Sequence, residues 1–308
     1  MKSALVFWVE EYFYKPRLAQ KLLSFLLLPL SWIYCFVAWT RYKNSSEIDH
    51  GISVISVGNL SVGGSGKTPL VTALAKHYEG VAIVLRGYGR SSRGLVVVSD
   101  GVGVLASVDQ SGDEAMIYAL KLPNAIVIVS EDRSVGIKEA KNMGAKVVFL
   151  DDGYSKHSIK KLDLLIDVDL PHNFCLPSGA LRERLWRGKK ATVLKEGRDF
   201  RRAVSIMDKS DKMSLITAIA RPTRLDAYLP SGVVSKNYFA DHHAFNRDEV
   251  VSILQRDGNS RALVTFKDFV KMRDFDLDLA LLDLAVEVDE WVFEEIDKYI
   301  RSRVAKKD

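Results

Sequence analysis

The distribution of apolar and polar residues differs between two parts of the chain. From Leu22 to Thr40, nineteen consecutive residues carry no charge, and basic residues lie on both sides. A helix of this length spans about 28 Å, close to the thickness of the hydrocarbon layer of a bilayer. We therefore expect residues 1–45 to form a membrane-associated helix, which either spans the bilayer or lies in its interface. A buried core helix is the alternative.

From Gly51 onward, short apolar runs alternate with segments of helical period. The runs are mostly apolar on consecutive residues, as in strands that are buried on both faces of a parallel sheet. They are Ile52–Val57, Val81–Leu85, Leu95–Val98, Ala125–Val129, Lys146–Leu150 and Asp163–Asp167. Helices are predicted over Thr68–Glu79, Glu114–Leu120 and Gly136–Met143. This alternation predicts a doubly wound α/β domain over residues 46–190.

A second pattern follows a basic stretch near residue 190. It predicts strands over Ser214–Ala220, Gly232–Phe239, Ala262–Thr265 and Leu279–Val288, and a closing helix over Asp289–Val304. We therefore expect a second, smaller α/β domain over residues 191–308.

Composition and charge narrow the possible functions. The chain has 308 residues, of which 47% are hydrophobic and 27% charged, which excludes a disordered or fibrous protein. Its net charge of +5 is concentrated between Arg182 and Arg202, which favours either a solvated surface or an anionic partner such as lipid head groups. Nucleic acid is not expected, because few aromatic residues accompany the charge. Cys35 and Cys175 are too few for a disulfide framework or a cysteine-rich metal site.

A glycine-rich loop between the first predicted strand and the first predicted helix is the strongest chemical signal. Glycines there allow backbone N–H groups to surround phosphate oxygens, and the start of a helix adds positive potential. A lysine and a hydroxyl residue at its end are suited to phosphate and Mg²⁺. The predicted phosphate-binding residues are Ser61, Val62, Gly63, Gly64, Ser65, Gly66, Lys67 and Thr68. Ser61 replaces the first glycine of the strict P-loop pattern.

A carboxylate pair follows the strand predicted to end at Leu150. Asp151 and Asp152 are placed where P-loop enzymes hold Mg²⁺, directly or through water. The fold expected from both signals is that of a P-loop NTPase. A GTPase is not expected, because no complete guanine-binding motif is present. A nucleotide-dependent binding or maturation protein without kinase activity remains the alternative to an enzyme.

Several short motifs together resemble one family, the tetraacyldisaccharide 4'-kinases of Gram-negative bacteria. They are V-G-N-L-S-V-G-G-S-G-K-T-P (57–69), R-G-Y-G-R (86–90), G-D-E-A (112–115), E-D-R (131–133), D-D-G-Y (151–154), L-P-S-G-A-L-R-E (176–183), I-A-R-P (219–222) and D-H-H-A-F (241–245). Two departures are His157, one position later than in the family, and Phe266, which replaces a glutamate in T-E-K-D.

The resemblance implies phosphoryl transfer from ATP, with Mg²⁺, to the 4'-hydroxyl of a tetraacyldisaccharide 1-phosphate. The enzyme would work on the cytoplasmic face of the inner membrane. Asp113 would act as base, paired with His242, although His243 is adjacent. Lys67 would assist the transfer, and Glu114 would contact Mg²⁺ through water. Arg86, Tyr88 and Arg182 would face the substrate. The sequence leaves the oligomeric state open.

Overall fold

The computed structural model describes residues 2–219, 222–241 and 243–305. Two compact units interleave along the chain. The first contains Met1–Lys67, Phe149–Phe200 and Asp289–Asp308, and the second contains Thr68–Val148 and Arg201–Val288. Helices and largely parallel strands make up both, which confirms the predicted α/β class. The segments 1–45, 46–190 and 191–308 stay a prediction.

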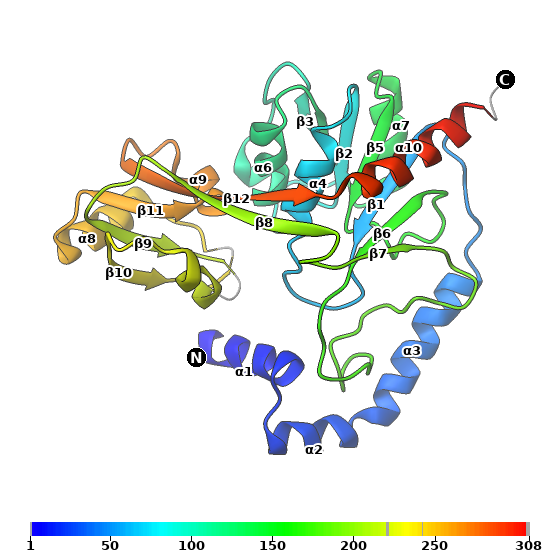
Figure 1. Ribbon diagram of the computed structural model, residues 1–308, viewed down its shortest axis with the longest axis horizontal. Helices are drawn as coiled ribbons and strands as arrows, with labels where there is room; N and C mark the ends of the chain where they lie inside the picture. The colour runs from blue at the N-terminus through cyan, green and yellow to red at the C-terminus, as the bar shows by residue number, and fades with distance from the viewer. Residues whose placement is uncertain (1, 220–221, 242, 306–308) are drawn as a thin grey trace. The chain divides into compact units, whose positions relative to one another are not determined.

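Three helices begin the first unit, namely α1 (Lys2–Tyr14), α2 (Leu18–Leu26) and α3 (Leu28–Lys43), drawn in blue in Figure 1. The prediction of a single helix over Leu22–Thr40 is therefore wrong. Among the described residues no single helix is long and apolar enough to cross a membrane. By length and composition alone, α2 and α3 together are, but the chain bends by 58° between them. Pro29 lies in the first turn of α3, where its missing N–H is tolerated, whereas it would disrupt a helix interior.

Seven strands form the larger sheet in the order β3-β4-β2-β5-β1-β6-β7. Their bounds are β1 Ser53–Gly58, β2 Val81–Leu85, β3 Val96–Asp100, β4 Ile126–Val129, β5 Val147–Asp151, β6 Leu162–Ile166 and β7 Thr192–Leu194. β1 pairs parallel with β6, and β2 pairs parallel with β4. The edge strand β3 is antiparallel to β4, and the short β7 was not predicted. Every residue of β1, β2, β4 and β5 is buried, which explains their unbroken apolar runs.

Four helices accompany these strands. They are α4 (Lys67–Ala75), α5 (Val108–Ser111), α6 (Asp113–Lys121) and α7 (Arg133–Asn142). α6 packs against β3 and β4, while α7 packs against β2 and β4. The sequence predicted three of them, and the four-residue α5 was too short to predict.

A five-stranded sheet has the order β10-β9-β11-β12-β8. Its strands are β8 Phe200–Met207, β9 Met213–Thr217, β10 Val233–Tyr238, β11 Arg261–Thr265 and β12 Asp278–Val288. The helical segments that accompany or follow it are η1 (Pro222–Tyr228), α8 (Arg247–Asp257), α9 (Phe266–Met272) and the closing α10 (Glu290–Val304). β8 was not predicted, because two arginines interrupt its apolar pattern.

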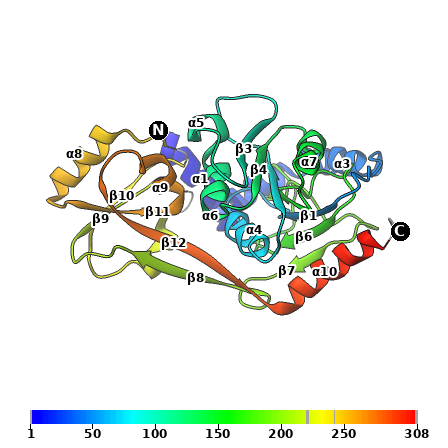
Figure 2. The same ribbon diagram turned by 90° about the horizontal axis from the view of Figure 1, so that it is seen from above.

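Adjacent residues of the small sheet lie in different cores. Ile216 belongs to a cluster with Val250 and Leu254 of α8, whereas Leu215 belongs to a cluster with Leu263 and other strand residues. This alternation follows from the two-residue period of a strand. α8 contacts β9, and α9 contacts β11 and β12 (Figure 2).

Candidate active site

The glycine-rich loop joins the end of β1 to the start of α4, as the sequence predicted. Gly63 and Gly66 have positive φ angles of 89° and 79°, which favour glycine at both positions. At Gly64 an added Cβ would meet no atom within 4 Å, so that glycine is not required by close packing. The backbone of the loop therefore depends on two of its three glycines.

The ammonium group of Lys67 lies among polar groups of its own loop. Its Nζ donates to Asn59 Oδ1 at 3.0 Å and to Ser65 Oγ at 3.4 Å. It also lies 3.6 Å from Asp152 Oδ1. Lys67 thus connects the phosphate loop to the carboxylate pair at the end of β5, two features that the sequence predicted separately.

Asn59 is a site residue to which the sequence assigned no role. Its side chain is buried and donates to the carbonyl oxygen of Ser61 at 2.8 Å. Its Oδ1 accepts from both Lys67 and Arg182, the latter at 3.1 Å. The only signal for it was its place in the V-G-N-L-S motif. Asn59 holds two cations at the start of the loop.

Arg182 binds Asp152 through two hydrogen bonds, one of them 2.8 Å from Nη1 to Oδ2 and the other from Nη2 to Oδ1. Burial opposes ionisation of Asp152, but Lys67 and Arg182 hold its pKa below the ordinary value. Asp152 also has a positive φ of 54°, uncommon for a residue with a side chain. A metal ion bound through this carboxylate would replace part of its contact with Arg182.

Lys67 and Arg182 bring two cationic side chains to this loop, and such groups are suited to a polyphosphate. Asp151 is buried beside them, and the side chain of Thr68 is partly exposed. Within the described residues, no group of three or more His, Cys, Asp and Glu side chains is arranged to hold a metal ion. Mg²⁺ typically binds through one or two carboxylates together with phosphate oxygens and water, and Asp151 and Asp152 are carboxylates of that kind.

The L-P-S-G-A-L-R-E segment positions Arg182 by pairing with the glycine-rich loop. Val62 N–H donates to Ala180 at 2.9 Å, and Arg182 N–H donates to Leu60 at 2.9 Å. Gly179 is required here, because a Cβ would lie 2.3 Å from the carbonyl oxygen of Phe174. These backbone hydrogen bonds therefore hold Arg182 beside the glycine-rich loop.

A cavity of about 290 Å³ adjoins the start of the loop. Leu60 and Ser61 line it together with Leu165, Asp167, Leu181 and Arg184. Its walls combine apolar and polar side chains.

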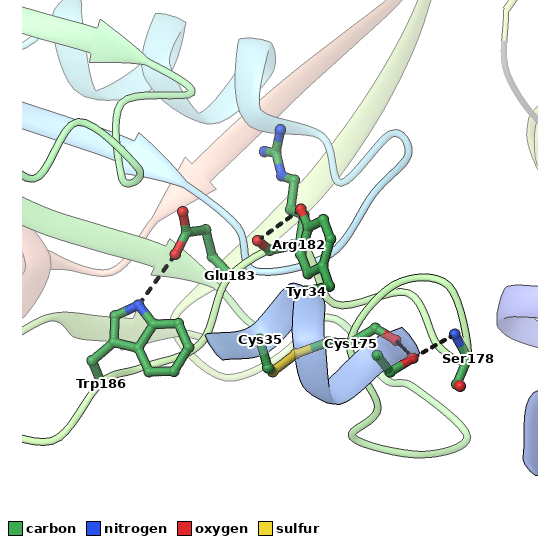
Figure 3. Close-up of a disulfide and its surroundings, with 8 residues drawn as sticks. Tyr34, Cys35, Cys175, Ser178, Arg182, Glu183 and Trp186 are labelled. Carbon is green, nitrogen blue, oxygen red and sulfur yellow. Dashed lines mark hydrogen bonds between the residues drawn. A yellow bond between two sulfur atoms is a disulfide. The ribbon is translucent and has the colours of Figure 1, made fainter. Parts of the chain in front are cut away.

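The N-terminal helices bind the same segment through side chains. Tyr34 donates to the carbonyl oxygen of Arg182 at 3.3 Å, and Ser31 donates to that of Cys175 at 2.9 Å. Ser24 and Tyr12 donate to the carbonyl oxygen of Ser178. Figure 3 shows Tyr34 and Cys35 of α3 beside this segment.

Cys35 and Cys175 form a disulfide between α3 and the same segment (Figure 3). No sequence pattern predicted a bond between two cysteines 140 positions apart. One such bond is not a disulfide framework, but it links α3 directly to the segment that carries Arg182.

His157, whose role the sequence left open, is buried in a structural cluster. Its Nδ1 lies 2.7 Å from Lys189 Nζ, and its Nε2 lies 3.5 Å from Glu183 Oε2. Tyr42 of α3 and Tyr154 present their rings edge-on to the imidazole. His157 thus joins α3 to the residues that follow Arg182. Lys189 is internal here, so the basic stretch is not entirely a solvated surface.

Burial shifts the titration of two groups in this cluster. It raises the pKa of Tyr154, to which the charges of Asp163 and Glu183 add. The Tyr154 hydroxyl donates to the carbonyl oxygen of Arg184 at 2.8 Å. Burial also lowers the pKa of Lys161 to about 8, although the Asp163 carboxylate 3.3 Å away opposes that shift. Because its pKa is raised, the Tyr154 hydroxyl remains neutral at physiological pH.

In the second unit, the R-G-Y-G-R and G-D-E-A motifs meet backbone to backbone. A Cβ on Gly112 would lie 2.8 Å from the carbonyl oxygen of Tyr88. Gly87 has a φ of 69°, and a Cβ there would lie 2.7 Å from Arg90 Cδ. Arg86 is exposed, and Tyr88 is 68% exposed, so both are accessible to a substrate.

Asp113, the expected base, is the first residue of α6. A carboxylate is favoured at that end of a helix. Its Oδ2 lies 3.2 Å from Lys271 Nζ, a contact that the sequence did not indicate. Glu114 follows it and is partly exposed.

The D-H-H-A-F motif is described in part. His242 lies outside the described residues. His243 Nε2 is 2.9 Å from Glu249 Oε2 of α8, and its ring stacks on Phe239. Asp241 accepts from Lys267 at 2.7 Å. The imidazole of His243 is therefore engaged by α8.

Two other motifs have structural roles. In E-D-R, Asp132 caps α7 by accepting from Ser134 N–H. In T-F-K-D, Thr265 caps α9 and accepts from Asp268 N–H, while the Asp268 carboxylate accepts from Thr217, Thr265 and Ala218. Burial raises the pKa of Asp268, although these hydrogen bonds and Lys271 oppose the shift. The departure at Phe266 leaves this cap intact.

Comparisons with known proteins agree with this arrangement. A model of the family "Tetraacyldisaccharide-1-P 4'-kinase" matches residues 23–304. The tetraacyldisaccharide 4'-kinase of Aliarcobacter butzleri is 44% identical over 98% of this chain and 99% of its own. Those of Helicobacter pylori and Campylobacter jejuni are 46% and 44% identical, over 98% and 96% of this chain and 97% and 96% of theirs.

A solved structure is also similar. The crystal structure of LpxK from Aquifex aeolicus in complex with ATP aligns with a TM-score of 0.70 and 25% identity, covering 91% of this chain and 99% of that one. Sequence and fold thus agree over nearly the whole length. The chain belongs to the tetraacyldisaccharide-1-P 4'-kinase family.

Proposed function

We propose that this chain transfers the γ-phosphoryl group of ATP to the 4'-hydroxyl of a tetraacyldisaccharide 1-phosphate, a step of lipid A biosynthesis. Near full-length similarity to named 4'-kinases supports the activity. The single structural observation that carries it is the convergence of Lys67 and Arg182 on Asn59 and Asp152 beside the glycine-rich loop.

The loop residues position the phosphate groups and neutralise their charge. Phosphoryl transfer proceeds through a loose transition state whose charge lies on phosphate oxygens, so catalysis depends on positioning and neutralisation. Val62 N–H is engaged by Ala180, so backbone N–H groups from Gly63 to Gly66 would bind the phosphates. Lys67 would neutralise them together with Arg182, which the resemblance assigned to the substrate and which binds beside the loop. Bound Mg²⁺ supplies further neutralisation, and we assign Thr68, Asp151, Asp152 and Glu114 as the oxygen donors on its side.

The acceptor hydroxyl needs a group that takes its proton as the oxygen–phosphorus bond forms. We assign this role to Asp113, with His242 as its partner. The proton passes from the hydroxyl to the carboxylate, the hydroxyl oxygen bonds to the γ-phosphorus, and the departing ADP keeps the electron pair of the broken phosphorus–oxygen bond. Arg86 and Tyr88 are exposed near the start of α6 and are assigned to the substrate.

The N-terminal helices are suited to a membrane surface. Their buried positions include polar residues, namely Gln20, Ser24 and Ser31. Their exposed positions are large and apolar, with exposures of 42–76% at Leu18, Leu22, Phe25, Leu26, Leu30, Trp32, Ile33, Phe36, Val37 and Trp39. This is the reverse of a soluble surface helix and supports contact with lipid acyl chains.

These features support a reaction at a membrane that contains the acylated substrate. ATP is supplied from the cytoplasm, so we assign the enzyme to the cytoplasmic face of the inner membrane. Its named relatives come from Gram-negative bacteria. The disaccharide head group would enter the site while the acyl chains stay in the bilayer.

The test is incubation with γ-labelled ATP, Mg²⁺ and tetraacyldisaccharide 1-phosphate in detergent micelles, followed by chromatography of the lipid. We expect labelled lipid from the wild type and a loss on the order of 10²–10³-fold for Lys67→Met. Lys76→Met, which changes an exposed lysine just after the same helix, is the matched control. ATP binding without labelled lipid would instead favour a nucleotide-dependent binding or maturation protein.

A further inference from the structure

Lys271 of α9 is a buried cation between two carboxylates. Its side chain is 8% exposed, and its Nζ lies 3.2 Å from Asp113 Oδ2 and 3.9 Å from Asp268 Oδ1. Nζ also donates to the carbonyl oxygen of His243 at 3.1 Å. It therefore touches α6, α9 and the D-H-H-A-F motif at one point.

The surroundings fix this ammonium group in place. α6 and α9 share a small core in which Met116 and Ile117 pack with Val270 and Phe266. Asp268 is fully buried and already accepts from two hydroxyl groups and one backbone N–H. Asp268 is thus held by other groups and gives Lys271 only a longer charge contact of 3.9 Å, whereas the shortest ionic contact of Lys271 is with Asp113.

An ion pair of this kind defines the orientation of the carboxylate. A base must present an oxygen within hydrogen-bond distance of the proton that it removes, and small misplacements cost much of the rate. The contact commits Oδ2 of Asp113 to Lys271. A lysine gives a strong charge contact here without the planar geometry of arginine.

We propose that Lys271 is a positioning residue for the phosphoryl transfer, holding the Asp113 carboxylate and the backbone of His243 in register. The proposal rests on the proposed function of Asp113 as the base. Lys271 does not itself exchange a proton with the substrate. Its contribution is made through Asp113, and therefore appears in turnover rather than in nucleotide binding.

The experiment compares Lys271→Met and Lys271→Arg in the full-length enzyme, with kcat and the KM values for ATP and lipid measured separately. For Lys271→Met we expect kcat to fall on the order of 10–100-fold while KM for ATP changes less than about threefold. Lys271→Arg retains the charge and should recover part of the loss. Combining Lys271→Met with Asp113→Asn should add little to the effect of Asp113→Asn alone.

Lys121→Met is the matched control, because Lys121 lies at the other end of α6, pairs with Asp283 and contacts Phe266 of α9. Its kcat should stay near the wild-type value. Full activity of Lys271→Met, or equal losses in Lys271→Met, Lys271→Arg and Lys121→Met, would overturn the positioning role. A wild-type enzyme that labels no lipid would overturn the proposed function itself.

Discussion

Ser178 N–H donates a buried hydrogen bond of 2.9 Å to Ser31 Oγ, which joins helix α3 to the segment that carries Arg182. Ser31 in turn donates to the carbonyl oxygen of Cys175. Four residues beyond Ser178, the guanidinium of Arg182 binds Asp152. The helices with a lipid-suited surface are thus bonded to the segment that positions a cation at the phosphate loop.

Removing the Ser31 hydroxyl tests this connection. Ser31→Ala leaves the buried Ser178 N–H without that partner, whereas the Cys175 carbonyl still accepts from Gly179 N–H. A buried unsatisfied group costs about 1–3 kcal/mol. We expect lower thermal stability and a kcat reduced on the order of tenfold, because Arg182 is held less firmly. Ser45→Ala, which removes a hydroxyl bonded to Tyr42 near the end of α3, should change kcat little. Equal kcat in both variants would argue against the connection.

The exposed apolar side chains of α3 should determine membrane binding. Trp32 and Phe36 are 69% and 62% exposed, so replacing both by serine removes little internal packing. Each such side chain contributes about 1.5–3 kcal/mol when it leaves water, so binding should weaken at least about tenfold. Co-sedimentation with phosphatidylethanolamine–phosphatidylglycerol vesicles measures this.

The matched control for that experiment is a variant with serine at Val102 and Leu105. These side chains are 92% and 60% exposed in a loop of the second unit. Their replacement should leave vesicle binding unchanged. A Trp32→Ser, Phe36→Ser variant that still sediments like the wild type would refute the lipid-facing assignment.

The disulfide should affect stability more than activity. It closes a long loop, and oxidised disulfides of that kind contribute about 3–5 kcal/mol. Cys35→Ser should keep kcat within about twofold, because hydrogen bonds from Ser24 and Ser31 hold the same segments together. Dithiothreitol should lower the melting temperature of the wild type but not of Cys35→Ser. In a reducing cytoplasm the two thiols are expected to be unlinked.

Asp257 gives the small sheet a defined acid sensitivity. Burial opposes its ionisation, but hydrogen bonds from Ser235, Asn237, Arg256 and Ser214 lower its pKa to about 2. A pKa below the unfolded value of about 3.9 stabilises the fold above pH 4, and that contribution is lost as pH falls toward 2. Asp257→Asn should cost about 1–3 kcal/mol at pH 7. Urea unfolding at pH 7 and pH 3 should show this difference narrowing, whereas a constant difference would contradict it.

Local patterns predicted the centre of the larger sheet and its phosphate loop. Val81–Leu85 forms a strand with the bounds expected, because a run of consecutive apolar residues is typical of a strand that is buried on both faces of the sheet. The loop from Ser61 to Thr68 lies between strand and helix, as its glycines indicated. Strand β8 was not predicted, because Arg201 and Arg202 interrupt the apolar pattern of a strand that is covered on only one face.

Contacts between distant segments were beyond the reach of sequence patterns. Asp113 and Lys271 are separated by more than 150 positions, and only the packing of α6 on α9 brings them together. The role of Asn59 likewise depends on Arg182 approaching from another segment. Ser24 of α2 and Ser31 of α3, on either side of the bend, are both bonded to the 175–178 segment, and no hydropathy pattern contains such contacts.

Positional analysis of the lipid product decides whether Asp113 and the phosphate loop together carry out the transfer. Wild-type enzyme, Asp113→Asn and Asp283→Asn are each incubated with ATP, Mg²⁺ and tetraacyldisaccharide 1-phosphate, and the product is analysed by ³¹P NMR and mass spectrometry. We expect a new phosphomonoester at the 4' position, formed by Asp283→Asn as by the wild type and 10²–10⁴-fold more slowly by Asp113→Asn, as roughly expected for a lost base. Phosphate at another position, or undiminished turnover by Asp113→Asn, would contradict the proposed reaction.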